Sequence, residues 1–363
     1  MGTLDKLFRQ RKTRPFSTWQ IELTTRCPLK CTMCIKDEYR DWHQKEMDFG
    51  NFKRIVPFLK DVQSVVLEGW GESLLYKHLV ECILLVRREG TEVGFVTSGM
   101  GLTGEYAKDL IAAGIDFIGF SLSGATSGTH NAIRVNSDFD ALINSIMFMK
   151  RLTAEKGMTK PAIHIVYLML KENIDEVPSL IDLAGTTGIR DVVLINAIHI
   201  TNTRQDKERV FTCEETNDEP YRAILTEARK RAQRHEINLN MPSLRPCDVA
   251  VCAENPLKNL YISADGEVSP CVYLGPPIRS PFKRIFCGEE HSTERVSFGN
   301  IFREHIKDIW NSKTYTAFRN CFFLRKKQFG ENYQALLEMR RIEQTPLPEP
   351  PEPCKTCHKI LGV

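Results

Sequence analysis

The first 240 residues of the chain alternate between two hydrophobic patterns. Short apolar runs rich in β-branched residues are typical of strands buried in a sheet, and they recur between segments of helical periodicity. The runs are TWQIEL from Thr18, SVVLE from Ser64, EVGFVT from Glu92, FIGFSL from Phe117, AIHIVYL from Ala162 and DVVLINA from Asp191. This alternation predicts six βα units with short connections, and therefore a parallel sheet.

Helical periodicity fills the intervals between these runs. Four helices are predicted, over residues 77–89, 104–113, 138–156 and 175–184. Val80 and Leu84 lie on the expected apolar face of the first, and Thr103 and Gly114 bound the second as cap and stop residues. We therefore predict an α/β fold in which the sheet curls into a partial (β/α)6 barrel, similar to a TIM barrel.

The pattern changes near Pro242, where the alternation ends and cysteine becomes frequent. The run LYISADGEVSPC reads as a β-hairpin with Asp265-Gly266 as its two-residue turn. We predict a basic arm over residues 1–17, the partial barrel over 18–241 and a small C-terminal hairpin and helix domain over 242–363.

Composition is typical of a globular protein with a core. Of the 363 residues, 42% are hydrophobic and 26% are charged. A net charge of +3 is too small to indicate a nucleic-acid partner, and no apolar run is long enough for a membrane span. The N-terminal cations are expected to form a solvated arm; they are Lys6, Arg9, Arg11, Lys12 and Arg14. Many free thiols without an export signal favour a reducing compartment, the cytoplasm.

Cys27, Cys31 and Cys34 carry the strongest chemical signal. Their spacing is Cys-x3-Cys-x2-Cys, and three thiolates this close can hold three irons of a 4Fe–4S cubane, leaving the fourth iron open. A structural zinc site would need a fourth ligand, for which His43 is the nearest candidate, and usually a second cysteine pair. A disulfide framework is not expected in a chain of this length without a signal peptide.

This spacing on a loop after a first strand resembles the radical S-adenosylmethionine (SAM) superfamily. The resemblance implies that SAM chelates the open iron, and that an electron from the cluster cleaves SAM to a 5′-deoxyadenosyl radical. The residue before the third cysteine, usually aromatic in the family and close to the adenine, is Met33 here. A flexible thioether can also pack on a purine.

The resemblance assigns further SAM contacts to the ends of successive strands. Glu68 to Ser73 resembles the family's Gly-Gly-Glu-Pro motif, which places Gly69, Gly71 and Glu72 near the SAM ammonium. Ser98 and Ser121 correspond to residues that contact the ribose. Arg134, in a His-x-x-x-Arg run from His130, would bind the SAM carboxylate with paired hydrogen bonds.

A second cysteine set lies in the C-terminal segment. Spacing alone leaves zinc and a 4Fe–4S cluster open. The resemblance to SPASM/twitch extensions favours an auxiliary 4Fe–4S cluster, held by Cys252, Cys271, Cys354 and Cys357. The proline-rich stretch from Thr345 to Pro353 is expected to bring the last pair to the hairpin.

The remaining cysteines have weaker assignments. Cys247 and Cys321 are spare candidates for the auxiliary cluster, and Cys82 lies on an apolar helix face and is expected in the core. Cys213 and Cys287 have no evident partner in the sequence.

The sequence predicts an oxidoreductase that abstracts hydrogen with a 5′-deoxyadenosyl radical and uses the auxiliary cluster as electron acceptor. A small alcohol or amino-sugar substrate is favoured, because only about 17 residues precede the first strand and leave no room for a peptide-binding wing. Peptide or protein side-chain modification is the alternative, and a non-catalytic Fe–S electron carrier is the alternative of another class. A flavodoxin or ferredoxin is the expected reductant, and the general base cannot be named.

Overall fold

The fold is organised around one curved sheet. The computed structural model describes residues 14–214, 221–338 and 345–363. Within these residues nine strands form the sheet in the order β11-β10-β1-β3-β4-β5-β7-β8-β9. The strands are β1 (Phe16–Ile21), β3 (Val62–Val66), β4 (Glu92–Thr97), β5 (Phe117–Leu122), β7 (Ala162–Met169), β8 (Asp191–Asn196), β9 (Asn238–Asn240), β10 (Asn259–Ile262) and β11 (Val268–Ser269). All neighbouring pairs are parallel except β10 and β11, which confirms the predicted α/β fold.

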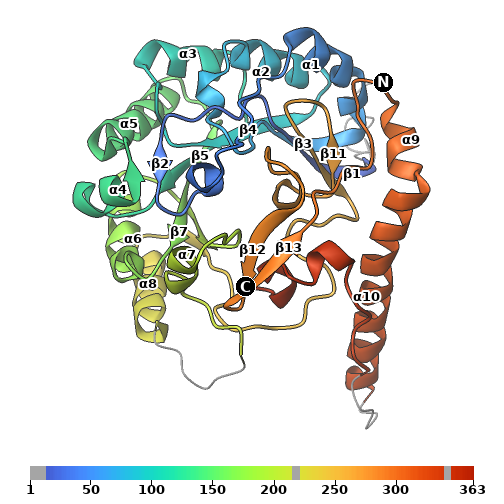
Figure 1. Cartoon of the computed structure of the whole chain (residues 1–363). Coiled ribbons are helices and arrows are strands. Elements are labelled where there is room, and N and C mark those ends of the chain that lie inside the picture. Colours follow the sequence, from blue (N-terminus) through green and yellow to red (C-terminus); the bar gives the residue numbers. More distant parts are fainter. Residues whose placement is uncertain (1–13, 215–220, 339–344) are drawn as a thin grey trace, which may run out of the picture.

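Helices cover the outer face of the sheet, as a series of βα crossovers requires. Figure 1 shows them as an arc around the strands, with β12 (Phe282–Phe286) and β13 (Glu289–Thr293) inside the arc. The helices of this part of the chain are α1 (Phe49–Ile55), α2 (Leu79–Arg88), α3 (Gly104–Ala112), α4 (Ser127–Ile133), α5 (Phe139–Glu155), α6 (Val177–Thr186), α7 (Thr203–Lys207) and α8 (Arg222–Arg234). Thr103 caps α3 as predicted, since its side chain accepts a hydrogen bond from the Tyr106 backbone N–H at 3.2 Å.

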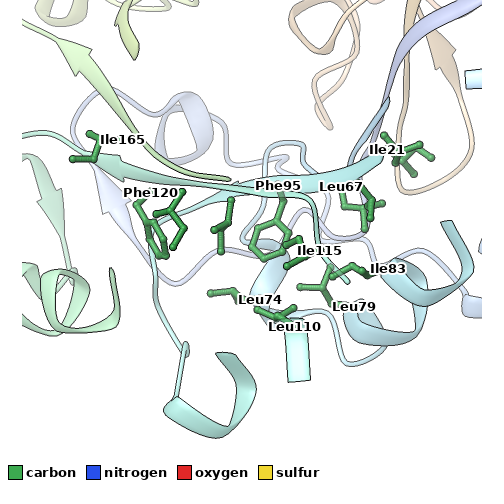
Figure 2. Close-up of a cluster of buried hydrophobic side chains, with 14 of the residues drawn as sticks. Ile21, Leu67, Leu74, Leu79, Ile83, Phe95, Leu110, Ile115, Phe120 and Ile165 are labelled. Atoms are coloured by element: carbon green, nitrogen blue, oxygen red, sulfur yellow. The ribbon is translucent and has the colours of Figure 1, made fainter. Parts of the chain in front are cut away.

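The main core lies between the sheet and these helices. Figure 2 shows Phe95 and Phe120 from the strands facing Leu79, Ile83 and Leu110 from α2 and α3. Cys82 is fully buried in this layer, as expected. The predicted face of α2 was partly wrong, because Leu84 is exposed while Leu79 and Ile83 face the sheet.

The C-terminal segment completes the same sheet. β10 pairs with β1 in parallel, and α9 (Ile306–Asn311) packs through Trp310 against Phe16, with ring centroids 4.8 Å apart. α10 (Lys313–Leu337) then runs along the edge of the molecule (Figure 1). The chain from Thr345 returns beside α10, where Asn332 donates to the Thr345 carbonyl at 2.7 Å.

The β10–β11 connection differs from the predicted two-residue turn. Ser263 pairs with Glu267, so three residues form the loop, and Gly266 adopts φ +86° at its end. The loop is a tight turn followed by a left-handed residue, in which only glycine is unstrained. Asn300 holds this loop by donating to the Asp265 carbonyl at 2.9 Å.

The N-terminal arm lies mostly outside the described residues, which begin at position 14. Arg14 contradicts the expectation of a solvated arm, because its guanidinium donates to Thr91 Oγ1 at 2.7 Å and to the Gly90 carbonyl at 2.9 Å. These contacts fix it to the start of β4. In the described part of the chain, no helix has the length and apolar character needed to cross a membrane.

Glu22 ties three parts of the fold together beneath the end of β1. It is 1% exposed, and its carboxylate accepts hydrogen bonds from the Trp70 N–H at 2.7 Å and the Ala264 N–H at 3.2 Å. These donors belong to the loop after β3 and to the β10–β11 loop. Burial raises the pKa of Glu22 from 4.5 to about 7, although the two backbone donors oppose the shift.

Glu22→Gln should flatten the pH dependence of folding stability. The raised pKa means that the folded chain keeps a proton that the unfolded chain releases, so the stabilisation is complete below pH 4.5 and is lost as the pH rises through about 7. The wild-type loss from this group is about 3 kcal/mol. Glutamine stays neutral at every pH, so urea unfolding on both sides of this window should show a smaller slope. Glu105→Gln is the control, because the Glu105 carboxylate is 83% exposed. Equal slopes of unfolding free energy against pH in Glu22→Gln and wild type would contradict the raised pKa of Glu22.

Candidate functional site: a cysteine-lined cavity and a second thiol cluster

The three N-terminal cysteines line a cavity at the carboxyl ends of the parallel strands. The cavity has a volume of about 270 Å³. Its wall includes every residue predicted to bind SAM or the first cluster, namely Cys27, Cys31, Met33, Cys34, Gly69, Gly71, Glu72, Ser98, Ser121 and Arg134. The structure therefore brings this set together, and the individual roles remain predictions.

The cysteine loop is shaped by a small two-stranded sheet. β2 (Lys30–Cys31) pairs with β6 (Arg134–Val135), which places Arg134 directly opposite Cys31. The Lys36 ammonium donates to the Cys27 carbonyl at 2.8 Å and closes the loop from the other side. Arg134 is thereby fixed beside the cysteines, where its Nε donates to Ser123 Oγ at 2.9 Å.

Gly69 and Gly71 are required for contacts between protein segments. A Cβ at Gly71 would lie 2.8 Å from the Arg26 carbonyl and closer still to the Thr24 carbonyl. A Cβ at Gly69 would overlap the Glu22 side chain. The loop after β3 thus packs directly against the backbone that leads into Cys27. The sequence had suggested a ligand as the reason for these glycines, whereas the backbone of the neighbouring loop is the nearer constraint.

Glu72 is largely satisfied by the protein itself. Its Oε1 accepts from Thr97 Oγ1 at 2.7 Å and the Leu74 N–H at 3.1 Å, and its Oε2 accepts from Ser98 N–H at 2.9 Å and Ser98 Oγ at 2.6 Å. Glu72 and Ser98 therefore join the ends of β3 and β4, in addition to lining the cavity.

Two uncharged acid–base side chains also line the cavity. Burial raises the pKa of Glu68 to about 8, so its carboxyl is largely protonated at neutral pH. His199, three residues after β8, is 9% exposed, and burial holds its pKa well below the usual value, so the imidazole is neutral. Sequence reasoning missed His199, because only its position at a strand end distinguished it.

Neither ring nitrogen of His199 has a hydrogen-bond partner among the residues that the structure describes. The ring lies among aromatic side chains, with centroids 5.3 Å from Trp70, 5.6 Å from Phe282 and 6.3 Å from Tyr273. A buried polar group without a partner is unfavourable, so the empty hydrogen-bonding capacity of His199 points to a ligand in the cavity.

The four C-terminal cysteines gather near Tyr273, which lines the cavity and is close enough for Cys271 and Cys357 to act on it. Each acts electrostatically on others of the set, and burial raises the pKa of Cys252 to about 12 and that of Cys271 and Cys354 well above the usual range. Cys357 belongs to the same group. Of the two spare cysteines, Cys321 is close enough to influence Cys354, whereas Cys247 lies exposed near the C terminus, with its N–H bonded to the Leu361 carbonyl at 2.7 Å.

Neither predicted thiol set is as compact as a single zinc ion would require. Thiolates around one tetrahedral zinc would lie ~3.8 Å apart, given a Zn–S bond of about 2.3 Å. Among the described residues, the only potential ligand group with all its atoms within 4.8 Å of one another is Cys213, Cys287 and His358. Neither predicted cysteine set is that compact, in keeping with ligands around an Fe–S cubane.

Cys213 and Cys287, which had no evident partner in the sequence, form a disulfide with each other. The bond joins the segment after α7 to the turn between β12 and β13, across 74 residues of sequence. His358 beside it accepts from the Cys287 N–H at 3.2 Å through Nε2 and bonds the Ile198 carbonyl at 3.3 Å through Nδ1. Both nitrogens are occupied, so this group is a disulfide with a structural histidine.

A curved parallel sheet with three cysteines after β1, together with a second thiol set, agrees with the expected class of Fe–S proteins that use SAM. The profile described as the radical SAM superfamily matches residues 21–184, and that of the SPASM domain, an iron–sulfur cluster-binding domain, matches residues 252–358. The chain is a radical SAM protein with a C-terminal SPASM domain. The radical SAM domain implies that the chain binds SAM and a 4Fe–4S cluster. The SPASM domain implies additional Fe–S clusters in the C-terminal part.

Several described proteins align with most of this chain. The tungsten-containing aldehyde ferredoxin oxidoreductase cofactor-modifying protein of Pyrococcus furiosus is 25% identical over 82% of this chain and 82% of its own length. The PqqA peptide cyclase of Methylobacterium nodulans is 26% identical over 84% of this chain and 76% of its own length. The structure of Streptococcus suis SuiB bound to SAM has the same fold, with a TM-score of 0.60 and 15% identity over 82% of this chain and 66% of SuiB.

Gly71→Ala should disturb the first cluster without removing any of its three cysteines. The added methyl group would push the loop after β3 away from the backbone that leads into Cys27. We expect SAM cleavage to fall on the order of 100-fold, because small displacements of a catalytic constellation are costly. Iron content and 5′-deoxyadenosine formation measure the effect.

Gly330→Ala in α10 is the matched control, since its added methyl group meets open space. It should keep wild-type iron content and SAM cleavage. Wild-type cleavage in Gly71→Ala would show that the contact between the two loops is dispensable.

Proposed function

We propose that this protein is a radical SAM enzyme that oxidises a side chain of a peptide or protein. The proposal rests on the relatives named as PqqA peptide cyclases, which align over 84% of this chain. It replaces the small alcohol or amino sugar that the sequence favoured. The short segment before the first strand does not argue against a peptide substrate, since a separate protein can recognise the peptide.

The small volume of the cavity favours a substrate of which only one side chain enters. A volume of about 270 Å³ lies at the lower limit of small-molecule sites, and SAM must occupy much of it. A second, small pocket of about 40 Å³ shares Met33, Ala197 and His199 with the cavity and is also lined by Arg204 of α7 and by Glu208. We propose that a substrate side chain approaches the cavity from this side while the rest of the peptide stays on the surface.

The residues around the cavity have distinct proposed roles. Cys27, Cys31 and Cys34 hold the first cluster, Arg134 orients the SAM carboxylate, and Cys252, Cys271, Cys354 and Cys357 hold the auxiliary cluster. When bound, SAM and the clusters supply a 5′-deoxyadenosyl radical and an electron acceptor. A flavodoxin or ferredoxin class protein would provide the reducing electron.

His199 is proposed to accept the proton that oxidation releases. Removal of a hydrogen atom from a C–H next to an N–H, O–H or S–H leaves a carbon radical. His199 would take up the proton that the oxidised side chain releases, and the auxiliary cluster, when bound, would supply the electron acceptor. The hydrogen atom, proton and electron together complete a two-electron oxidation.

Deuterium transfer can identify the substrate class before the substrate is known. Cells that carry this gene are grown in heavy water, and their peptides and their small metabolites are separated. Each fraction is incubated anaerobically with reconstituted enzyme, unlabelled SAM and dithionite. We expect deuterium in 5′-deoxyadenosine with the peptide fraction, because the radical takes its hydrogen from the substrate.

Digestion of the peptide fraction with a nonspecific protease is the control and should abolish the transfer. Transfer from the metabolite fraction alone would support a small substrate, such as a cofactor precursor, and overturn the peptide proposal. Absence of any 5′-deoxyadenosine with both clusters loaded would instead favour the electron-carrier function.

His199→Phe should uncouple SAM cleavage from product formation. The measured quantity is the ratio of peptide lacking two hydrogens to 5′-deoxyadenosine, and we expect it to fall about 100-fold without the proton acceptor. His199→Gln, which keeps a hydrogen-bonding side chain but cannot take the proton, should be similarly uncoupled. A wild-type ratio in both variants would exclude this role.

A further inference from the structure

Arg284 is a buried cation without an anionic partner in the described part of the chain. It lies on β12, is 1% exposed, and its guanidinium stands over the Phe282 ring at 5.4 Å. Both of its hydrogen bonds go to backbone carbonyls, those of Pro353 and Tyr273, each at 3.1 Å. A buried charge is unfavourable unless an opposite charge lies nearby.

The two carbonyls belong to the segments that carry the auxiliary cysteines. Pro353 precedes Cys354, and Tyr273 follows Cys271 by two residues. The guanidinium is therefore held by the residue directly before Cys354 and by a residue two positions after Cys271. Arg284 thus joins the C-terminal ligand segment to the hairpin segment at the edge of the thiol set.

Two other cations of the C-terminal segment, Lys359 and Arg325, have carboxylate partners. The Lys359 ammonium lies 3.2 Å from Glu254, and the buried Arg325 is paired with Asp248. Arg284 differs because no carboxylate of the described residues pairs with it, and both carbonyls that it binds belong to segments that carry the thiols. Four thiolates around a 4Fe–4S core carry a net negative charge, which becomes one unit more negative on reduction.

We propose that Arg284 is the fixed counter-charge of the auxiliary cluster and raises its reduction potential. This inference rests on the proposed ligand set of Cys252, Cys271, Cys354 and Cys357. A nearby positive charge favours the more negative, reduced state, and net charge and hydrogen bonding are the main means by which a protein sets cluster potentials. Tyr273 lines the substrate cavity and its carbonyl binds Arg284, so the cavity and the auxiliary site are neighbours. A higher reduction potential would make the auxiliary cluster a better acceptor for an electron from the substrate.

Redox titration of the full reconstituted chain tests the proposal without a substrate. Arg284→Gln keeps a donor for the backbone carbonyls and removes the charge, whereas Arg284→Lys keeps the charge. The potential of each cluster is followed by electron paramagnetic resonance, with Cys34→Ala used to assign the auxiliary signal. We expect Arg284→Gln to shift the auxiliary potential to more negative values, Arg284→Lys to stay close to wild type, and the SAM-site cluster to remain unchanged in both.

Arg325→Gln is the matched control. Arg325 is also a buried arginine bonded to backbone carbonyls, at Pro348 and Val249, but it already has Asp248 as its partner. This variant should leave the auxiliary potential at its wild-type value. An equal shift in Arg325→Gln would make the effect one of general packing and overturn the proposal.

Loss of cluster loading is also informative. If Arg284→Gln assembles only the SAM-site cluster while Arg284→Lys assembles both, the positive charge is needed and the proposal stands. If both variants lose the auxiliary cluster, the guanidinium acts as a structural clamp and the proposal fails. An unchanged auxiliary potential in Arg284→Gln overturns it directly. Because no substrate is present, these outcomes do not depend on whether the enzyme acts on peptides.

Discussion

The structure depends on the direct contact between the loop after β3 and the backbone that enters the cysteine loop after β1. Gly71 has no space for a side chain against Thr24 and Arg26, and Gly69 has none against Glu22. Parallel strands bring their carboxyl ends to one edge of the sheet, but a site needs those ends to be fixed relative to one another. The glycines provide this by close approach, and the hydrogen bonds of Glu22 and Glu72 secure it.

The same contact connects the N-terminal and C-terminal chemistry. Glu22 accepts one hydrogen bond from the loop after β3 and one from the β10–β11 loop, so one buried carboxylate joins the barrel to the hairpin that precedes Cys271. Tyr273 lines the cavity and also lies close to Cys271 and Cys357 of the second thiol set. The two cysteine sets are far apart in the sequence, but the pairing of β10 with β1 brings the C-terminal segment next to the start of the barrel.

Local pattern was sufficient for most of the fold. The six parallel strands follow from buried β-branched runs, and Thr103 and Gly114 bound α3 because caps and left-handed glycines are local features. Errors arose where a choice depended on neighbours. Leu84 belongs to a helical periodicity that two adjacent faces satisfy, and only the position of the sheet selects between them. The β10–β11 loop has three residues rather than two, and Asn300, distant in sequence, donates to its Asp265 carbonyl.

The sequence by itself determined which chemistry the protein can perform. Cys27, Cys31 and Cys34 lie within one loop, so their short spacing in the sequence already keeps the three thiols close together in space. Tertiary structure decided the rest, since side-chain environment depends on residues brought together by folding. It paired Cys213 with Cys287, left His199 unpartnered in the cavity, and buried Arg284 beside the auxiliary thiols. Burial and the absence of a partner are properties of a packed neighbourhood, and no local pattern encodes them.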